Sequence, residues 1–177
     1  MAARNSEDTF GWVTRMIHWV MALGVLAMLG FGSYIARMEV GMSNIWMFGV
    51  HKSIGIVLLA LLVMRIVWHF VSPVPESLPS GVAWKDRAAV WVHRAFYVLL
   101  IVVPLSGWIG SGATGLDVLV FNRIALPPLA PVSEAWEEAA FAVLFVATML
   151  LAACVVLHVA GAVMRKDGTL GRMVRGV

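Results

Sequence analysis

Cysteine and charge are both scarce in this chain of 177 residues. The single cysteine, Cys154, can form no internal disulfide and no cysteine-ligated iron–sulfur or zinc site. Only 13% of the residues are charged and 61% are hydrophobic, so a water-soluble domain would have too little polar surface to cover itself. A basic groove with interleaved aromatic residues is also lacking, which argues against nucleic acid as a partner. The composition therefore predicts an integral membrane protein.

What the chain does have is four apolar stretches long enough to cross a bilayer. About 20 apolar residues in a helix span a hydrocarbon core of roughly 30 Å, and such stretches lie at about 14–36, 45–71, 89–110 and 139–164. Pro73 and Pro75 end the second stretch, and a long loop over 111–137 precedes the fourth. We therefore expect an all-α fold, an integral membrane four-helix bundle in which residues 1–177 form one domain.

The positive charges are distributed unequally between the two sides of this expected bundle. Three of the thirteen Lys and Arg residues lie on one side: Arg37, Lys52 and Arg123. The other ten lie on the side of the chain termini: Arg4, Arg15, Arg65, Lys85, Arg87, Arg94, Arg165, Lys166, Arg172 and Arg175. Because Lys and Arg are enriched in cytoplasmic loops, we expect both the N- and C-termini to be cytoplasmic. The net charge of +3 then reflects membrane topology and contact with anionic lipid.

Four of the five histidines lie inside the apolar stretches: His18, His51, His93 and His158. A buried imidazole is costly unless something binds it. At 1.5 Å of rise per residue, three of the four lie one to two turns from the cytoplasmic face, and His51 lies alone near the outer face. Two facing imidazoles at one level are what a six-coordinate haem iron needs, whereas a single one equally suits a hydrogen bond between helices. The fifth, His69, lies between two aromatic residues and is interpreted as an interfacial anchor.

Several short runs along the chain carry a resemblance: Ile17-His18-Trp19, Val50-His51-Lys52-Ser53-Ile54-Gly55, Val92-His93 followed by Tyr97, Val103-Pro104-Leu105-Ser106-Gly107-Trp108, Leu157-His158-Val159-Ala160-Gly161 and Arg165-Lys166-Asp167-Gly168. In this order and spacing they resemble the bacterial cytochrome b561 family, from about Phe10 to Arg175. The resemblance implies a multi-pass b-type cytochrome of the bacterial inner membrane. Members exchange electrons between a donor and ubiquinone, one known activity is the oxidation of superoxide, and two haems b commonly lie one above the other.

The resemblance implies His18 and His158 as the axial ligands of the inner haem. His93, at the same level, is then an alternative ligand or a hydrogen-bond donor to a quinone carbonyl or a haem propionate, with a histidine that bridges two helices as the structural alternative. Gly161 and Gly55, one turn from His158 and His51, suit either a flat macrocycle or tight helix packing. Four arginines either pair with propionates or are ordinary cytoplasmic-side charges: Arg15, Arg65, Arg94 and Arg165.

The chain departs from the family pattern at one position. The family has a histidine fourteen residues before that of the last helix, and here this position is Leu144, which cannot bind iron. Three alternatives stay open for the outer site: no haem, a five-coordinate haem on His51 that can bind small ligands, or a further ligand such as Met149 or Met47. We expect the outer haem to be lost or altered, so that the chain carries one haem b, with two as the alternative.

Two classes of function stay open. The first is an electron carrier or quinone-linked oxidoreductase that passes electrons between a donor, either superoxide or a redox partner protein, and the quinone pool. Lys52 and Arg123 would then attract an anionic donor at the outer side. The second is a non-catalytic or haem-depleted subunit that anchors or assembles a larger respiratory or photosynthetic complex. A transporter is disfavoured, because the apolar stretches lack membrane-centre carboxylates and paired discontinuities.

Overall fold

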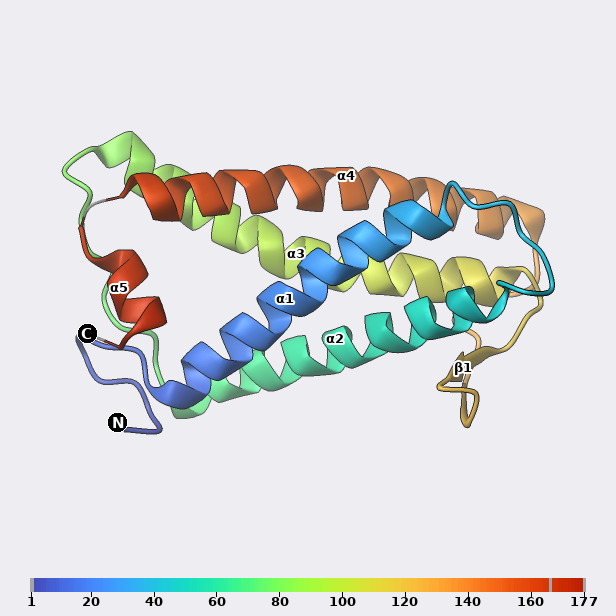
Figure 1. Ribbon diagram of the computed structural model, residues 1–177, viewed down its shortest axis with the longest axis horizontal. Coiled ribbons are helices and arrows are strands. Elements are labelled where there is room, and N and C mark those ends of the chain that lie inside the picture. The colour runs from blue at the N-terminus through green and yellow to red at the C-terminus, as the bar shows by residue number, and fades with distance from the viewer. Residues whose placement is uncertain (1, 166, 177) are drawn as a thin grey trace.

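Four long helices make up most of the computed structural model, which describes residues 2–165 and 167–176. They are α1 (Trp12–Ile35), α2 (Trp46–Val71), α3 (Ala83–Ala113) and α4 (Glu134–Met164). Each is long and apolar enough to cross a membrane, and the four run along the long axis of the molecule (Figure 1). Lys166, one of the ten charges expected on the cytoplasmic side, lies outside the described residues.

The helices α3 and α4 begin earlier than the apolar stretches predicted from 89 and 139. They start at Ala83 and Glu134, because helical hydrogen bonding continues through polar residues that lie beyond the apolar core. Glu134 and Glu137 occupy the first turn of α4, where a negative charge interacts favourably with the helix dipole. Pro104 lies inside α3 without ending it, which neighbouring helices make tolerable in a membrane bundle.

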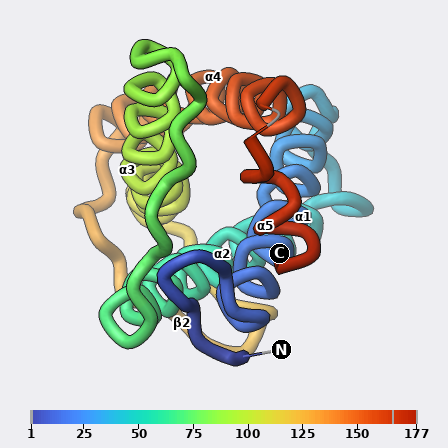
Figure 2. Tube along the Cα trace, turned by 90° about the vertical axis from the view of Figure 1, so that its left-hand side faces the viewer, coloured from blue at the N-terminus to red at the C-terminus, as the bar shows by residue number. Residues whose placement is uncertain are grey.

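Viewed along the bundle axis, the helices form a ring in the order α1, α2, α3, α4 (Figure 2). The closest packing is between α3 and α4, followed by α1 with α2 and α2 with α3, whereas α1 and α4 approach each other at few described positions. Two small buried clusters lie inside the ring, one around Leu99 and Leu151 and the other around Met21 and Leu62. Most large apolar side chains face outward instead, as a lipid environment requires.

The two ends of the bundle are built differently. One end, here called the terminal end, holds both described chain ends, the loop from α2 to α3 and the short helix α5 (Thr169–Val174) (Figure 1). The opposite end, here called the hairpin end, holds the connection from α1 to α2 and a β-hairpin of β1 (Val118–Val120) and β2 (Ile124–Leu126). The described members of the larger set of positive charges, ten in the sequence, belong to segments toward the terminal end. Arg37, Lys52 and Arg123 belong to segments toward the hairpin end.

The predicted bundle of four long helices is confirmed, and the loop expected over 111–137 contains, in addition, this short antiparallel hairpin. Three residues, 121–123, connect its strands, and the first two, Phe121 and Asn122, have φ angles of 49° and 56°, left-handed values that tight hairpin turns use. The fully buried Ser53 of α2 holds the turn in place: its hydroxyl accepts from the Phe121 N–H at 2.8 Å and donates to the Gly49 carbonyl at 2.7 Å. The hairpin is supported by this contact with a helix far away in the sequence. Its own three-residue strands are too short to predict it from the sequence.

Candidate cofactor site

Three imidazoles come together toward the terminal end of the bundle. His18 from α1 and His158 from α4 have ring centroids 6.1 Å apart and planes inclined at 51°. His93 from α3 lies against His158 edge to face, with centroids 5.1 Å apart and planes at 88°. The structure thus brings together the three histidines predicted to share one level, and it places them on three different helices.

The spacing of His18 and His158 is suited to a metal centre between them. A metal–imidazole bond is about 2 Å long. The distance between two ring centroids on one metal is two such bonds in line plus the distance from each nitrogen to the centre of its ring. This sum is close to the 6.1 Å between the centroids of His18 and His158. His158 also has open space nearby, because a Cβ added at Gly161 would meet no atom within 4 Å. The contact between His93 and His158 is a different one, since their ring centroids, 5.1 Å apart, are too close for two such bonds in line.

A bare metal ion does not fit this pair. The described residues contain no group of three or more His, Cys, Asp or Glu side chains arranged to hold a metal ion, whereas a structural or catalytic zinc needs at least three protein ligands. An iron that already carries four nitrogen donors from a porphyrin needs only two more, one on each face. The donor set of His18 and His158 therefore fits a haem better than a free ion.

His93 is held in a defined tautomer. Its Nδ1 lies 2.7 Å from the carbonyl oxygen of Ala89, one turn earlier in α3, and because a carbonyl only accepts, Nδ1 carries the proton. In the neutral ring the lone pair is then on Nε2. Its side chain is exposed, unlike the half-buried His18 and His158, so His93 is placed to accept or donate a proton at the edge of the site.

The hairpin end has one imidazole. His51 contacts α1, where its ring lies 5.8 Å from that of Phe31, and a Cβ on Gly32 would come within 3.0 Å of its Cε1. The other histidines make their ring contacts elsewhere. His51 Nδ1 is buried with no hydrogen-bond partner among the described residues, which costs about 1–3 kcal/mol. Leu144 on α4 lies toward α3, near Gly107.

The two residues predicted to attract an anionic donor both lie at the hairpin end. Lys52 is half-buried in α2, beside His51, and Arg123 is exposed as the last residue of the hairpin turn. In the described part of the chain, neither side chain forms a hydrogen bond or an ion pair. Attraction of an anionic donor by Lys52 and Arg123 therefore stays a prediction.

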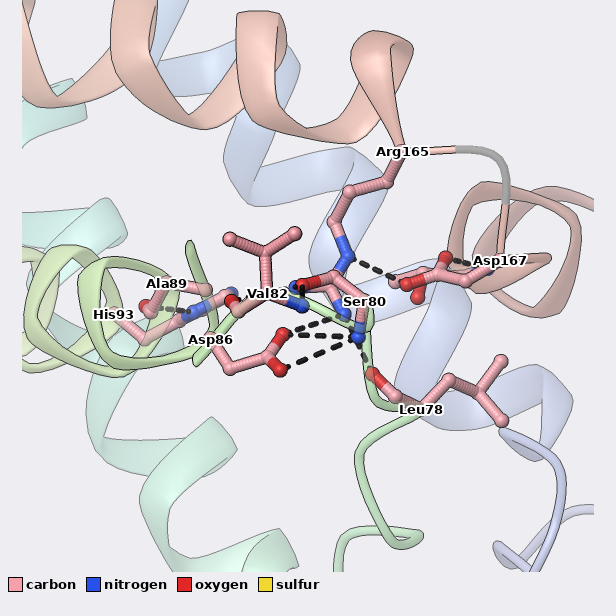
Figure 3. A network of polar contacts seen from close by, with 9 residues as sticks. Leu78, Ser80, Val82, Asp86, Ala89, His93, Arg165 and Asp167 are labelled. Carbon is pink, nitrogen blue, oxygen red and sulfur yellow. Dashed lines mark hydrogen bonds and ion pairs between the residues drawn. The ribbon is translucent and has the colours of Figure 1, made fainter. Parts of the chain in front are cut away.

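Arg165 is already engaged with protein groups. It forms ion pairs with Asp86 at 3.3 Å and Asp167 at 2.6 Å and donates to the carbonyl of Leu78 (Figure 3). Burial acts to raise the pKa of the Asp167 carboxyl, but hydrogen bonds from Thr169 and the ion pair with Arg165 outweigh it and hold the pKa below its ordinary value. This network joins the end of α4 to the start of α3.

Sequence reasoning missed one polar chain beside the imidazoles. Arg65 Nε donates to the Tyr97 hydroxyl at 3.4 Å, and this hydroxyl lies 3.3 Å from Nδ1 of His69. The prediction that His69 is only an interfacial anchor is therefore incomplete, because it has a partner inside the bundle. The spacing of Arg65 and His69, one helical turn apart, was a signal that both face the same neighbour.

Comparison with known proteins gives concordant findings. The family model described as "Prokaryotic cytochrome b561" matches residues 9–176. The chain is similar to "Cytochrome b561 homolog 2" of Escherichia coli (strain K12), with 32% identity over 145 residues, which cover 80% of this chain and 75% of that protein. It is also similar to "Cytochrome b562" of Cereibacter sphaeroides, with 32% identity over 120 residues, which cover 62% of this chain and 74% of that protein.

Proposed function

Since this chain belongs to the prokaryotic cytochrome b561 family, and is thus a membrane b-type cytochrome of electron transport, we propose that it carries one haem b between His18 and His158 and exchanges electrons with the quinone pool. The family implies haem b as the cofactor. Haem supplies a one-electron couple within the membrane. The single observation that supports the proposed ligands is the pair of imidazoles with centroids 6.1 Å apart.

The three histidines have two different roles, haem binding and proton exchange. His18 and His158 bind from α1 and α4, the neighbouring helices that pack least on each other, so a flat group between them displaces little direct helix packing. In the neutral ring of His93, whose Nδ1 proton is bound to the Ala89 carbonyl, Nε2 accepts the proton that quinol oxidation releases. Once Nε2 is protonated, it donates a hydrogen bond to a quinone carbonyl and supplies the proton for quinone reduction. Its exposure at the edge of the site suits a substrate that arrives through the lipid.

We propose that the terminal end is cytoplasmic and that the membrane is the bacterial inner membrane. The terminal end carries most of the positive charges, and both described chain ends lie there. The site therefore lies near the cytoplasmic surface, from which protons for quinone chemistry are available. Fusion of a reporter enzyme active only in the periplasm to either terminus should give an inactive reporter, and activity at either terminus would contradict this orientation.

The hairpin end is a poor entry point for electrons if it lacks a haem. On α2, His51 lies toward the hairpin end and Arg65 lies toward the terminal end, near the proposed haem. These two residues are fourteen positions and so about 21 Å apart along the helix. Superoxide drawn toward Lys52 and Arg123 would have to pass its electron over this distance without a relay. We therefore propose that donor and quinone both reach the haem near the terminal end, and that a redox partner protein, rather than superoxide, is the donor.

Absorption spectra of four purified proteins test the proposed ligands. The wild-type protein should show a reducible, low-spin b-type spectrum, and His18→Ala and His158→Ala should each lose it. His51→Ala is the matched control, because this histidine lies at the hairpin end, away from the proposed ligand pair. A low-spin spectrum that survives in both ligand variants would contradict the proposal.

The same spectra address the alternative function. A haem-depleted subunit that anchors a larger complex would show no reducible band even in the wild-type protein, and it would purify with other subunits from the membrane. Reduction of the haem by a quinol analogue, followed in a stopped-flow spectrometer, should occur in the wild-type protein and slow in His93→Ala if His93 exchanges the proton.

A further inference from the structure

We propose that Arg65, held in position by Tyr97 and His69, pairs with a porphyrin carboxylate at the site of His18 and His158. This inference rests on the proposed function, because it assumes a haem between those two imidazoles. It adds a charged group that neither the histidine pattern nor the family membership assigns.

Arg65 is a charge placed within a membrane-spanning helix. It lies six residues before the end of α2 at Val71, which is about 9 Å along the helix, and its side chain is half-buried. A charged residue in such a position is costly and usually has a partner or a function. Its partner Tyr97 lies one turn after His93 in α3 and packs on the buried cluster that contains Ile17 and Met21, the residues one before and three after His18, so Arg65 is held beside the proposed site.

Tyr97 and His69 fix the direction of this side chain. The Tyr97 ring packs against the buried cluster around Met21 and Leu62, so its hydroxyl has a defined position between α2 and α3. That hydroxyl accepts from Arg65 Nε and lies 3.3 Å from His69 Nδ1, while the His69 ring meets the Tyr97 ring edge to face, with centroids 6.3 Å apart. With Nε used in this way, the two terminal nitrogens of Arg65 remain for a carboxylate, which guanidinium binds in a fork.

The structure distinguishes Arg65 from the other three arginines considered as propionate partners. Arg165 is paired with two carboxylates of the chain. Arg94 is exposed and lies over the ring of Trp91, 5.2 Å from its centre. Arg15 is packed so closely on Gly176 that a Cβ there would overlap its guanidinium. Arg65 differs from these three in its hydrogen bond to Tyr97, which lies one turn after His93 in α3.

A positive charge at this place has two measurable effects. It stabilises the reduced haem relative to the oxidised haem, because reduction removes one positive charge from the iron, and it therefore raises the reduction potential. It also strengthens cofactor binding, since a charge-assisted hydrogen bond to a carboxylate is stronger than a neutral one. Tyr97 and His69 act only through Arg65, so their removal should give smaller changes of the same sign.

The test is a redox titration of the haem in the purified holoprotein, followed by its absorption. Arg65→Gln should shift the midpoint potential to lower values, Arg65→Lys should shift it less because the charge is kept, and Tyr97→Phe should give a smaller shift in the same direction. Release of haem to apomyoglobin should be about tenfold faster in Arg65→Gln. Arg94→Gln is the matched control, an arginine near the same end of the bundle that is expected to leave both quantities unchanged.

The proposal is overturned if Arg65→Gln and Tyr97→Phe both keep the wild-type potential and the wild-type rate of haem release. Arg65 would then be an interfacial charge that reaches toward lipid phosphate. If Arg65→Gln does not fold, Tyr97→Phe decides, since this change removes only a hydroxyl. A wild-type protein that binds no low-spin haem would instead refute the proposed function, so the two failures are distinguishable.

Discussion

The two ends of this bundle carry histidines in different surroundings. Toward the terminal end, His18 and His158 face each other across 6.1 Å, with His93 against them. At the hairpin end, His51 lies against Phe31 and Gly32 of α1, and its buried Nδ1 has no partner in the described chain. Histidine therefore has a second histidine beside it toward the terminal end and none beside it at the hairpin end.

From this difference we expect a haem between His18 and His158 and none on His51. What distinguishes His18 and His158 is that each has a second imidazole at the right distance, with Arg65 and Tyr97 bonded to each other nearby, whereas open space beside a glycine is found at both ends. His51 has open space beside Gly55 but lacks a second imidazole. We therefore expect the two ends to respond differently to the same kind of substitution.

The largest effect is expected at the paired site. His158→Ala removes one of two ligands and should abolish nearly all low-spin haem, because a single imidazole cannot complete a six-coordinate iron. His51→Ala should leave the haem content and spectrum unchanged. The measurement is the reduced-minus-oxidised absorption spectrum normalised to protein. Equal loss of pigment in the two variants would show that the ends do not differ in the way described.

The next largest effect should come from restoring the missing ligand. Leu144→His places an imidazole at the position where the family pattern has one, and we expect haem content to rise from one to two per chain. The double variant Leu144→His with His51→Ala should return to one, which identifies His51 as the partner. A content that stays at one in Leu144→His would mean that something other than this leucine closes the hairpin end to haem.

A smaller effect is expected at the hairpin itself, where a substitution should change the stability of the protein but not its haem spectrum. Ser53→Ala removes the hydroxyl that accepts from the Phe121 N–H and should lower the free energy of unfolding by about 1–3 kcal/mol. Thermal unfolding in detergent measures this, and the exposed Ser43→Ala serves as its control. The haem spectrum should not change in either variant, and a clear change in Ser53→Ala would couple the hairpin to the distant haem.

The smallest effect concerns the ion pairs of Arg165 at the terminal end. The pKa of Asp167 lies below its ordinary value, so its contribution to stability is fully present above the unfolded pKa of about 3.9 and is lost as pH falls through the folded pKa. Asp167→Asn should therefore reduce the loss of stability between about pH 5 and the folded pKa. Melting temperatures of the two proteins across this range provide the measurement, and parallel curves would contradict it.

The sequence was sufficient for the features that depend on composition and helical rise. The four apolar stretches lie within the four long helices except for Ala36 and Ile45, each one residue outside a helix, and counting residues from the helix ends was enough to group His18 with His93 and His158. Both inferences work because a bilayer fixes the length and the axis of each helix, so that one dimension of the fold can be read from residue number.

The features that depend on contact between distant segments could not be predicted in this way. The hairpin turn has Phe121 in a left-handed conformation that is unusual for a bulky residue, and its support comes from Ser53, 68 residues away. The link from Arg65 through Tyr97 to His69 likewise joins two helices. Rotation of each helix about its axis decides such contacts, and an apolar sequence with little amphipathic pattern specifies that rotation only weakly.

The haem-to-polypeptide ratio of the purified protein, from a pyridine haemochrome assay against amino-acid analysis, tests the difference between the two ends most directly. We predict a ratio of one for the wild-type chain and close to zero after His158→Ala. A ratio of two, or a ratio of one that persists in the variant, would contradict the account.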